Sequence, residues 1–109
     1  MNSYRKGYVY YKDEYAGILE ETDSGYLFTY DNQYFQKDDS KPISLTLPMT
    51  QETYESKTLF SFFDGLIPEG WLLDFVSHNW KIDKNNRFSI LLHIGKDTVG
   101  AVSILRDKL

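Results

Sequence analysis

The chain has 109 residues, of which 41% are hydrophobic and 17% aromatic, and its formal net charge is -4. This size fits one hydrophobic core, so we expect residues 1–109 to form a single domain, and the negative charge disfavours nucleic acids and anionic membranes as partners. The absence of cysteine excludes disulfides and thiolate chemistry, and without an apolar run of roughly 20 residues or a signal peptide we expect a cytoplasmic protein.

The N-terminal third of the sequence predicts an antiparallel meander. Residues 8–11 (YVYY) are aromatic and β-branched, and an apolar pattern resumes at residues 15–19 after a polar segment, which is typical of a hairpin. The segment at 23–25 (DSG) tolerates the dihedral angles of a tight turn, and residues 26–30 follow as a third strand.

A solvated loop at residues 36–41 precedes residues 42–48 (PISLTLP), in which apolar and polar side chains alternate between two prolines. The alternation places Ile43, Leu45 and Leu47 on one face. It predicts an edge strand, because proline is tolerated at sheet edges.

After residue 48 the apolar period lengthens to that of a helix. The first predicted helix is about two turns long, with Ser56 or Thr58 as its cap. Pro68 is suited to open a second helix, since the first turn does not need its missing N–H, and this helix is expected to end near Lys81. The predicted apolar faces are Leu59, Phe62, Phe63 and Leu66 on the first helix, and Leu72, Phe75, Val76, Asn79 and Trp80 on the second.

A third helix and a last strand complete the predicted elements. Asn85 or Asn86 is suited to cap the helix, and Gly95 to end it in a left-handed conformation. Residues 99–105 then predict a strand, with Gly100 at a bulge or a close packing point. The fold class expected from these elements is α+β, a small, curved, barrel-like antiparallel meander with about three short helices.

Trp71 lies outside the apolar stripe of the second predicted helix. Successive helical residues are about 100° apart, so the stripe is centred between Leu72 and Val76, and Trp71 falls on a flank with Asp74 and His78. The ring either folds back onto the margin of the core, which is common for tryptophan, or is partly exposed as an anchor for a partner protein, a role in which tryptophan is enriched.

Few residues are arranged for catalysis or metal binding. His78 and His93 fall on different predicted helices without a ligand motif around them, so we expect no metal and no cofactor. Asp74 and His78 stand at i, i+4 and, with Glu69, could form the acid-base cluster of a small hydrolase. Such groups usually form a solvated face, so we expect that the protein is not an enzyme.

Two further patterns are compatible with ligand binding. The glycines of residues 95–100 have the spacing of a phosphate-binding loop, but residues 101–102 lack the required lysine and hydroxyl group. The tyrosines of the predicted strands could stack on single-stranded nucleic acid, but the acidic balance opposes this partner, and tyrosine also packs well on half-buried strand faces.

Three stretches in this order resemble the N-terminal subdomain of HipA-family bacterial toxin kinases: residues 42–48 (PISLTLP), 59–70 (LFSFFDGLIPEG) and 91–102 (LLHIGKDTVGAV). The resemblance implies that this chain folds as a small curved sheet with helices. In the kinases this subdomain precedes the ATP-binding and catalytic portions. This sequence has no nucleotide loop and no catalytic aspartate with metal-binding partners, so it is not itself the kinase.

A free-standing copy of this subdomain resembles the HipS family of antitoxins in three-component HipBST systems. The resemblance implies that the protein binds and neutralises a HipA- or HipT-like serine/threonine kinase in trans, in a complex that can include a HipB-like helix-turn-helix protein. Kinases of the family generally carry polar or charged residues after the Pro-Glu-Gly step, where this sequence has Trp71 and Leu72.

The leading hypothesis is an antitoxin that places Trp71 in or near the kinase active site. The residues expected to bind the partner are Glu69, Gly70, Trp71, Asp74 and His78, with the polar side chains as a rim around the indole. The alternative is a structural subunit that completes the kinase fold, or bridges it to the HipB-like protein, without blocking catalysis.

Overall fold

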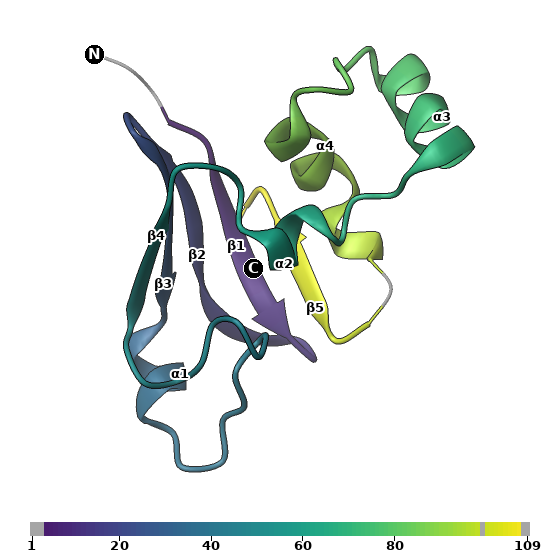
Figure 1. Cartoon of the computed structure of the whole chain (residues 1–109). Helices are drawn as coiled ribbons and strands as arrows, with labels where there is room; N and C mark the ends of the chain where they lie inside the picture. The colour runs from purple at the N-terminus through teal and green to yellow at the C-terminus, as the bar shows by residue number, and fades with distance from the viewer. Residues whose placement is uncertain (1–3, 99, 108–109) are drawn as a thin grey trace.

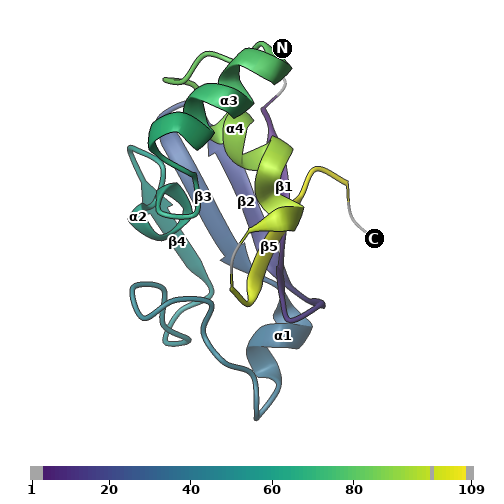
Figure 2. The same ribbon diagram turned by 90° about the vertical axis from the view of Figure 1, so that its right-hand side faces the viewer.

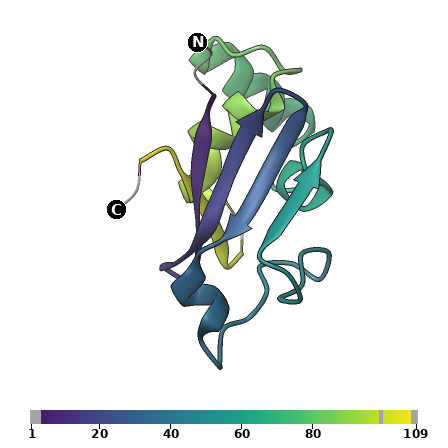
Figure 3. The ribbon, with the colours of Figure 1, turned by 90° about the vertical axis from the view of Figure 1, so that its left-hand side faces the viewer.

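The computed structural model describes residues 4–98 and 100–107, which form one five-stranded sheet with helices against one of its faces (Figures 1 and 2). The strand order is β4-β3-β2-β1-β5, and every neighbouring pair is antiparallel. The sheet is curved and does not close, and none of the helices in residues 4–98 and 100–107 covers the face seen in Figure 3. The expected α+β class is confirmed. The elements are β1 (Lys6–Tyr11), β2 (Glu14–Thr22), β3 (Gly25–Tyr30), α1 (Asn32–Gln36), β4 (Thr53–Ser56), α2 (Ser61–Asp64), α3 (Gly70–Trp80), α4 (Arg87–Ile94), the 3-10 helix η1 (Gly95–Asp97) and β5 (Val102–Leu105).

The first three predicted strands are confirmed as β1, β2 and β3. The turn between β1 and β2 is made by Lys12 and Asp13, which both have positive φ, as a tight hairpin turn requires. The last predicted strand begins later, at Val102, and position 99 lies outside the described residues. Gly100 is neither at a bulge nor closely packed. It precedes β5 with φ 116° and open space around it, so its role is conformational.

The core lies between the sheet and the helical layer. The sheet contributes residues such as Val9, Leu19 and Phe28, and α4 contributes Phe88 and Leu91, all almost fully buried. The packing of these apolar side chains, rather than helix propensity, stabilises helices this short.

Gly95 follows α4 in a right-handed conformation, so the predicted left-handed stop is wrong. The glycine is needed for a different reason. A Cβ atom at Gly95 would lie 2.3 Å from the carbonyl oxygen of Ile104 in β5, and neither backbone can yield. The close approach lets η1 pack directly on β5.

Residues 42–48 form an irregular loop, so the predicted edge strand is wrong. Ile43 and Leu47 are buried, but Leu45 is 94% exposed, so the three do not share a face. The buried hydroxyl of Tyr30 accepts a hydrogen bond from the N–H of Ile43 (3.1 Å) and donates one to the carbonyl of Leu47. A side chain from β3 thus satisfies backbone groups that a neighbouring strand would otherwise pair.

The helices partly follow the expected boundaries. α2 is a single turn without a side-chain cap, so neither Ser56 nor Thr58 caps it. α3 ends at the expected place, because Lys81 adopts a left-handed conformation directly after it. Asn86 caps α4 as expected, its side chain accepting from the N–H of Ser89.

Arg5 connects the sheet to α4. Its guanidinium donates two hydrogen bonds to the Glu21 carboxylate in β2, from Nε to Oε1 (3.1 Å) and from Nη2 to Oε2 (2.6 Å). Its Nη1 donates to Oδ1 of Asn86 (3.0 Å) and to the hydroxyl of Ser89. It also lies 5.2 Å from the ring centre of Phe88. One side chain therefore holds β2 and the start of α4 together.

Replacing Glu21 by glutamine is expected to lower the free energy of unfolding by about 1 kcal/mol at pH 7. The hydrogen bond from Arg5 holds the pKa of the Glu21 carboxyl below its usual value of 4.5. A carboxyl with a lowered folded-state pKa contributes stability above its unfolded-state pKa and loses it as the pH falls through the folded-state value. Urea unfolding at pH 7 should therefore show a deficit that disappears near about pH 3.

The matched control is Glu20→Gln. Glu20 is the neighbouring residue in β2, and within the described part of the chain it forms no ion pair. Its substitution should change stability by less than about 0.5 kcal/mol at either pH. A Glu21→Gln deficit that persists unchanged in acid would contradict the assignment.

Candidate partner-binding surface

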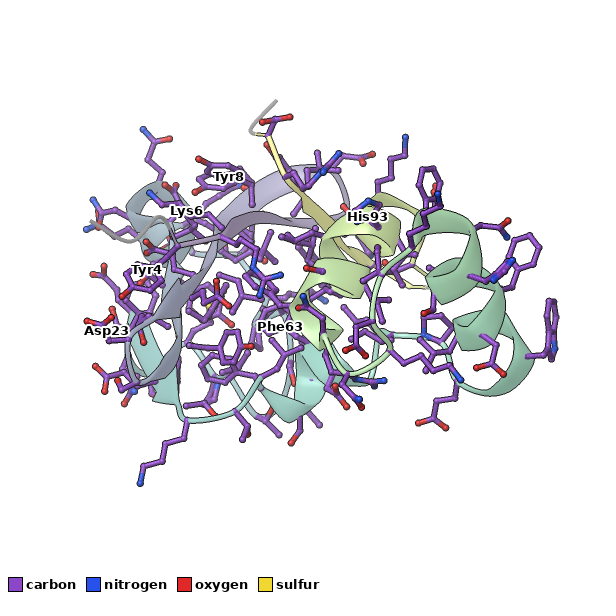
Figure 4. All side chains as sticks on the ribbon, turned by 90° about the horizontal axis from the view of Figure 1, so that it is seen from above. Tyr4, Lys6, Tyr8, Asp23, Phe63 and His93 are labelled. Carbon is purple, nitrogen blue, oxygen red and sulfur yellow. The ribbon has the colours of Figure 1, made fainter. Side chains whose placement is uncertain are left out.

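α3 lies at the outer margin of the helical layer, away from the sheet (Figures 1 and 4). It begins at Gly70, whose φ of 63° is the left-handed conformation that glycine adopts without strain. A Cβ atom at Gly70 would meet nothing within 4 Å, so there is room for a side chain. Glycine is favoured here because of the left-handed backbone conformation. With Lys81 left-handed at the other end, the chain changes direction sharply on both sides of α3.

Most of the apolar side chains of α3 face solvent. Val76 is buried and Leu73 half-buried, but Trp71 is 77%, Phe75 59% and Trp80 61% exposed. Of the two alternatives for Trp71, the exposed position is confirmed, and the ring does not fold back onto the core. The predicted buried face is wrong for Leu72, Phe75, Asn79 and Trp80, which are all exposed.

The physical reason is the width of the apolar arc. Apolar residues cover more of the circumference of α3 than one contact with the core can bury. The arc that packs inward contains Leu73, Val76 and Ser77, and the arc of Trp71 and Phe75 is left outside. Sequence reasoning therefore missed Phe75 as a surface residue. The available signal was its i+4 spacing from Trp71.

The other expected partner-binding residues also lie on the surface. Glu69, Gly70, Asp74 and His78 are exposed, and all lie on α3 or directly before it. Asp74 forms an ion pair with Lys84, in the segment that leads to α4. No hydrogen bond between Asp74 and His78 occurs among the described residues, so the geometry does not assemble the acid-base pair of a hydrolase.

A groove of about 470 Å³ runs along the other side of α3. Trp80 forms one wall, with its ring 5.4 Å from that of His93, which points from α4 toward α3 (Figure 4). His93 Nδ1 lies 3.1 Å from the carbonyl oxygen of Ser89, which leaves only the other ring nitrogen available. The remaining walls are mainly apolar, formed by Leu66, Ile67, Pro68, Leu72, Val76 and Ile94.

The sheet tyrosines do not form one stacking platform. Tyr8 contacts Tyr15, with ring centres 6.2 Å apart. Tyr26 instead packs on Phe88 of α4, on the covered face, and Tyr30 is buried against the loop at 42–48. Between residues 4 and 98 and between 100 and 107, no cluster of His, Asp or Glu is suited to hold a metal ion, and no helix is long and apolar enough to cross a bilayer.

The fold and surface are those of a small α+β domain with an exposed apolar helix, and comparison with known proteins gives its family. The sequence profile described as HipA N-terminal domain matches residues 7–105. An uncharacterized protein of Haemophilus influenzae is 36% identical over 104 residues, which cover 95% of this chain and 94% of that protein. The chain therefore belongs to the HipA N-terminal domain family.

Two relatives of this chain are named as kinases. The putative kinase Y4mE of Sinorhizobium fredii is 27% identical over 73% of this chain and 19% of its own length. The serine/threonine-protein kinase toxin HipA of Shewanella oneidensis is 33% identical over 59% of this chain and 14% of its own length. This chain thus matches only a small part of each kinase.

The solved structures include a chain described as the N-terminal domain of HipA toxin. It is 32% identical to this protein, with a TM-score of 0.75, over 99% of this chain and 97% of that one. The likeness therefore extends over both the sheet and the helices.

Proposed function

We propose that this protein is an antitoxin that binds a HipA-family serine/threonine kinase in trans and inhibits it by placing Trp71 in or near the active site. The observation that carries the proposal is the exposed indole on the first turn of α3, in a domain that corresponds to only 14–19% of the length of related kinases. The single domain of residues 1–109 acts as a binding module, without catalysis or a cofactor.

The physical basis is the suitability of the ring as an anchor. Tryptophan offers a large, rigid contact area at a low cost in side-chain entropy, and such anchors dominate interface energetics. Gly70 sets the direction of the first turn, and Glu69, Asp74 and His78 provide the polar rim. A partner can approach α3 because the helix lies at the margin of the fold (Figure 1).

The proposed setting is the cytoplasm, in a toxin–antitoxin complex that can include a HipB-like DNA-binding protein. The net charge of -4 fits a subunit that does not itself contact DNA. Recognition of DNA would then rest with the HipB-like protein.

The test is a titration of the full-length HipA-family kinase encoded in the same genome, with phosphorylation as the readout. The wild-type protein should inhibit saturably. Trp71→Ala should raise the half-inhibitory concentration about 30-fold, which corresponds to about 2 kcal/mol for an anchor residue. Leu45→Ala is the control, because Leu45 is also highly exposed but lies on the loop at 42–48. Equal potency of the Trp71→Ala and wild-type proteins would refute the active-site role.

The second candidate function is a structural subunit that completes or bridges the kinase. It is favoured by the two kinases that carry the matching segment within their own chains. In this case the wild-type protein would bind tightly, and kinase activity would stay unchanged or rise. The same titration therefore separates the two functions.

A further inference from the structure

Trp71 and Phe75 lie one turn apart on the same face of α3. Their i, i+4 spacing puts their Cβ atoms about 5–6 Å apart and rotates the two side chains by only about 40° about the helix axis. Within the described chain, neither ring stacks on another aromatic ring or on a cation. The two side chains therefore form one exposed ridge, which we call the two-ring ridge.

The side chains around the ridge leave it accessible. Asn79, one turn after Phe75, folds back so that its Nδ2 donates to the carbonyl oxygen of Phe75 at 3.0 Å. Asp74 is drawn toward Lys84 by their ion pair. Two polar residues beside the ridge, Asp74 and Asn79, thus already have partners within the chain.

The two rings together expose more apolar area than a single isolated surface residue does. With 77% and 59% of their surfaces exposed, the two aromatic residues present on the order of 300 Å² of mostly apolar area. The largest apolar patch on a typical monomeric protein is about 300–600 Å² and is often functional, so the ridge is a candidate interaction site. Burial of only the indole would leave the Phe75 ring in water at the edge of the interface.

We propose that the two-ring ridge is a single binding unit, in which Phe75 is a second anchor that enters the same apolar cleft of the kinase as Trp71. This inference rests on the proposed function and takes the same kinase as the partner, because Phe75 is continuous with the indole on one helix face. The cleft must be wide enough for two rings spaced one helical turn apart. A cleft that admits Trp71 alone would be a different recognition mode.

The experiment is a double-mutant cycle. The dissociation constants of the full-length kinase for the wild-type, Trp71→Ala, Phe75→Ala and doubly substituted proteins are measured by titration calorimetry. Each single substitution should weaken binding about 10- to 100-fold. Since neighbouring residues in one pocket are coupled, the loss in the double variant should be at least about 3-fold smaller than the product of the single losses.

Trp80→Ala is the matched control. Trp80 is an exposed aromatic residue on the same helix, but it lies roughly 140° or more from either ring of the ridge. Its substitution should change the dissociation constant less than about 3-fold. Thermal unfolding of every variant checks that the fold is intact, and the ridge variants should unfold at the wild-type temperature because both rings are outside the core.

The possible results separate the inference from the proposed function. Wild-type affinity of the Phe75→Ala protein, with binding lost in the Trp71→Ala protein, overturns the second anchor and leaves the antitoxin proposal standing. If the affinity loss of the double variant equals the product of the two single losses, the two rings are not coupled, and the proposal of a shared cleft is overturned. A wild-type protein that does not bind the kinase overturns both proposals.

Discussion

Replacing Phe63 by alanine is expected to lower the free energy of unfolding by about 3–5 kcal/mol, the usual cost of removing a large ring from a core. Phe63 is fully buried where α2 meets the sheet (Figure 4). Its ring centre lies 5.6 Å from that of Phe28 in β3, and 5.2 and 6.1 Å from those of Phe62 and Phe60. A one-turn helix has little stability of its own, so α2 depends on this packing.

Urea unfolding measures the effect, and Phe75→Ala provides a control with the same chemical change. The control ring is mostly exposed on α3, so its removal should change stability by less than about 0.5 kcal/mol. Domains are stable by only about 5–15 kcal/mol, so this loss is a large fraction of the total and should lower the urea midpoint and the melting temperature markedly. Similar losses for both substitutions would show that α2 is not held by Phe63.

Tyr30→Phe is expected to cost about 3 kcal/mol, although it removes a single oxygen atom. The lost hydroxyl leaves the N–H of Ile43 and the carbonyl of Leu47 without their partner, and each unsatisfied buried group costs about 1–3 kcal/mol. Burial raises the pKa of Tyr30 to about 12, so the hydroxyl remains protonated and able to donate at ordinary pH. The ring itself stays in place, which confines the change to the loop at 42–48.

Amide hydrogen exchange at Ile43, measured together with urea unfolding, tests this prediction. The Tyr30→Phe protein should exchange faster at Ile43 while the exchange in β1 and β2 changes less. Tyr8→Phe is the control, since the Tyr8 hydroxyl makes no hydrogen bond within residues 4–98 and 100–107. A stable Tyr30→Phe protein with unchanged exchange at Ile43 would rule out the anchoring role of the hydroxyl.

The strands of the first hairpin were predictable because their apolar and aromatic residues lie in short runs separated by turn residues. The loop at 42–48 was not, because its regular alternation also suits a strand. The difference is decided by Tyr30, which is 13 residues before Ile43 and 17 before Leu47 in sequence. A local pattern carries no information about such a partner.

Two elements were missed because they are short. β4 is polar and forms by pairing with β3, with Tyr26 opposite Ser56 and Phe28 opposite Tyr54. α1 is a single turn whose start is fixed by Asp31, which accepts from the N–H of Tyr34. Neither is long enough to show a hydrophobic period.

The surface of α3 was half predictable. The helical wheel gives the angular separation of Trp71 from the stripe, and the exposure of the indole follows from it. When apolar residues cover much of the circumference of a helix, the wheel does not show which part of that circumference meets the core. That choice depends on the packing of Val76 and on the direction that Gly70 imposes on the helix, and both are tertiary features.

The position of β5 beside β1 affects the order in which this protein can fold. Tyr8 near the start of the described chain pairs with Leu105 near its end, so the sheet cannot be completed until the last strand has left the ribosome. Until then β1 has an open edge, and the core lacks Val102 and Ile104. Since α4 and η1 pack on β5, this part of the helical layer cannot be completed before β5 has been made, and α3, whose Trp80 contacts His93 of α4, gains that support only then.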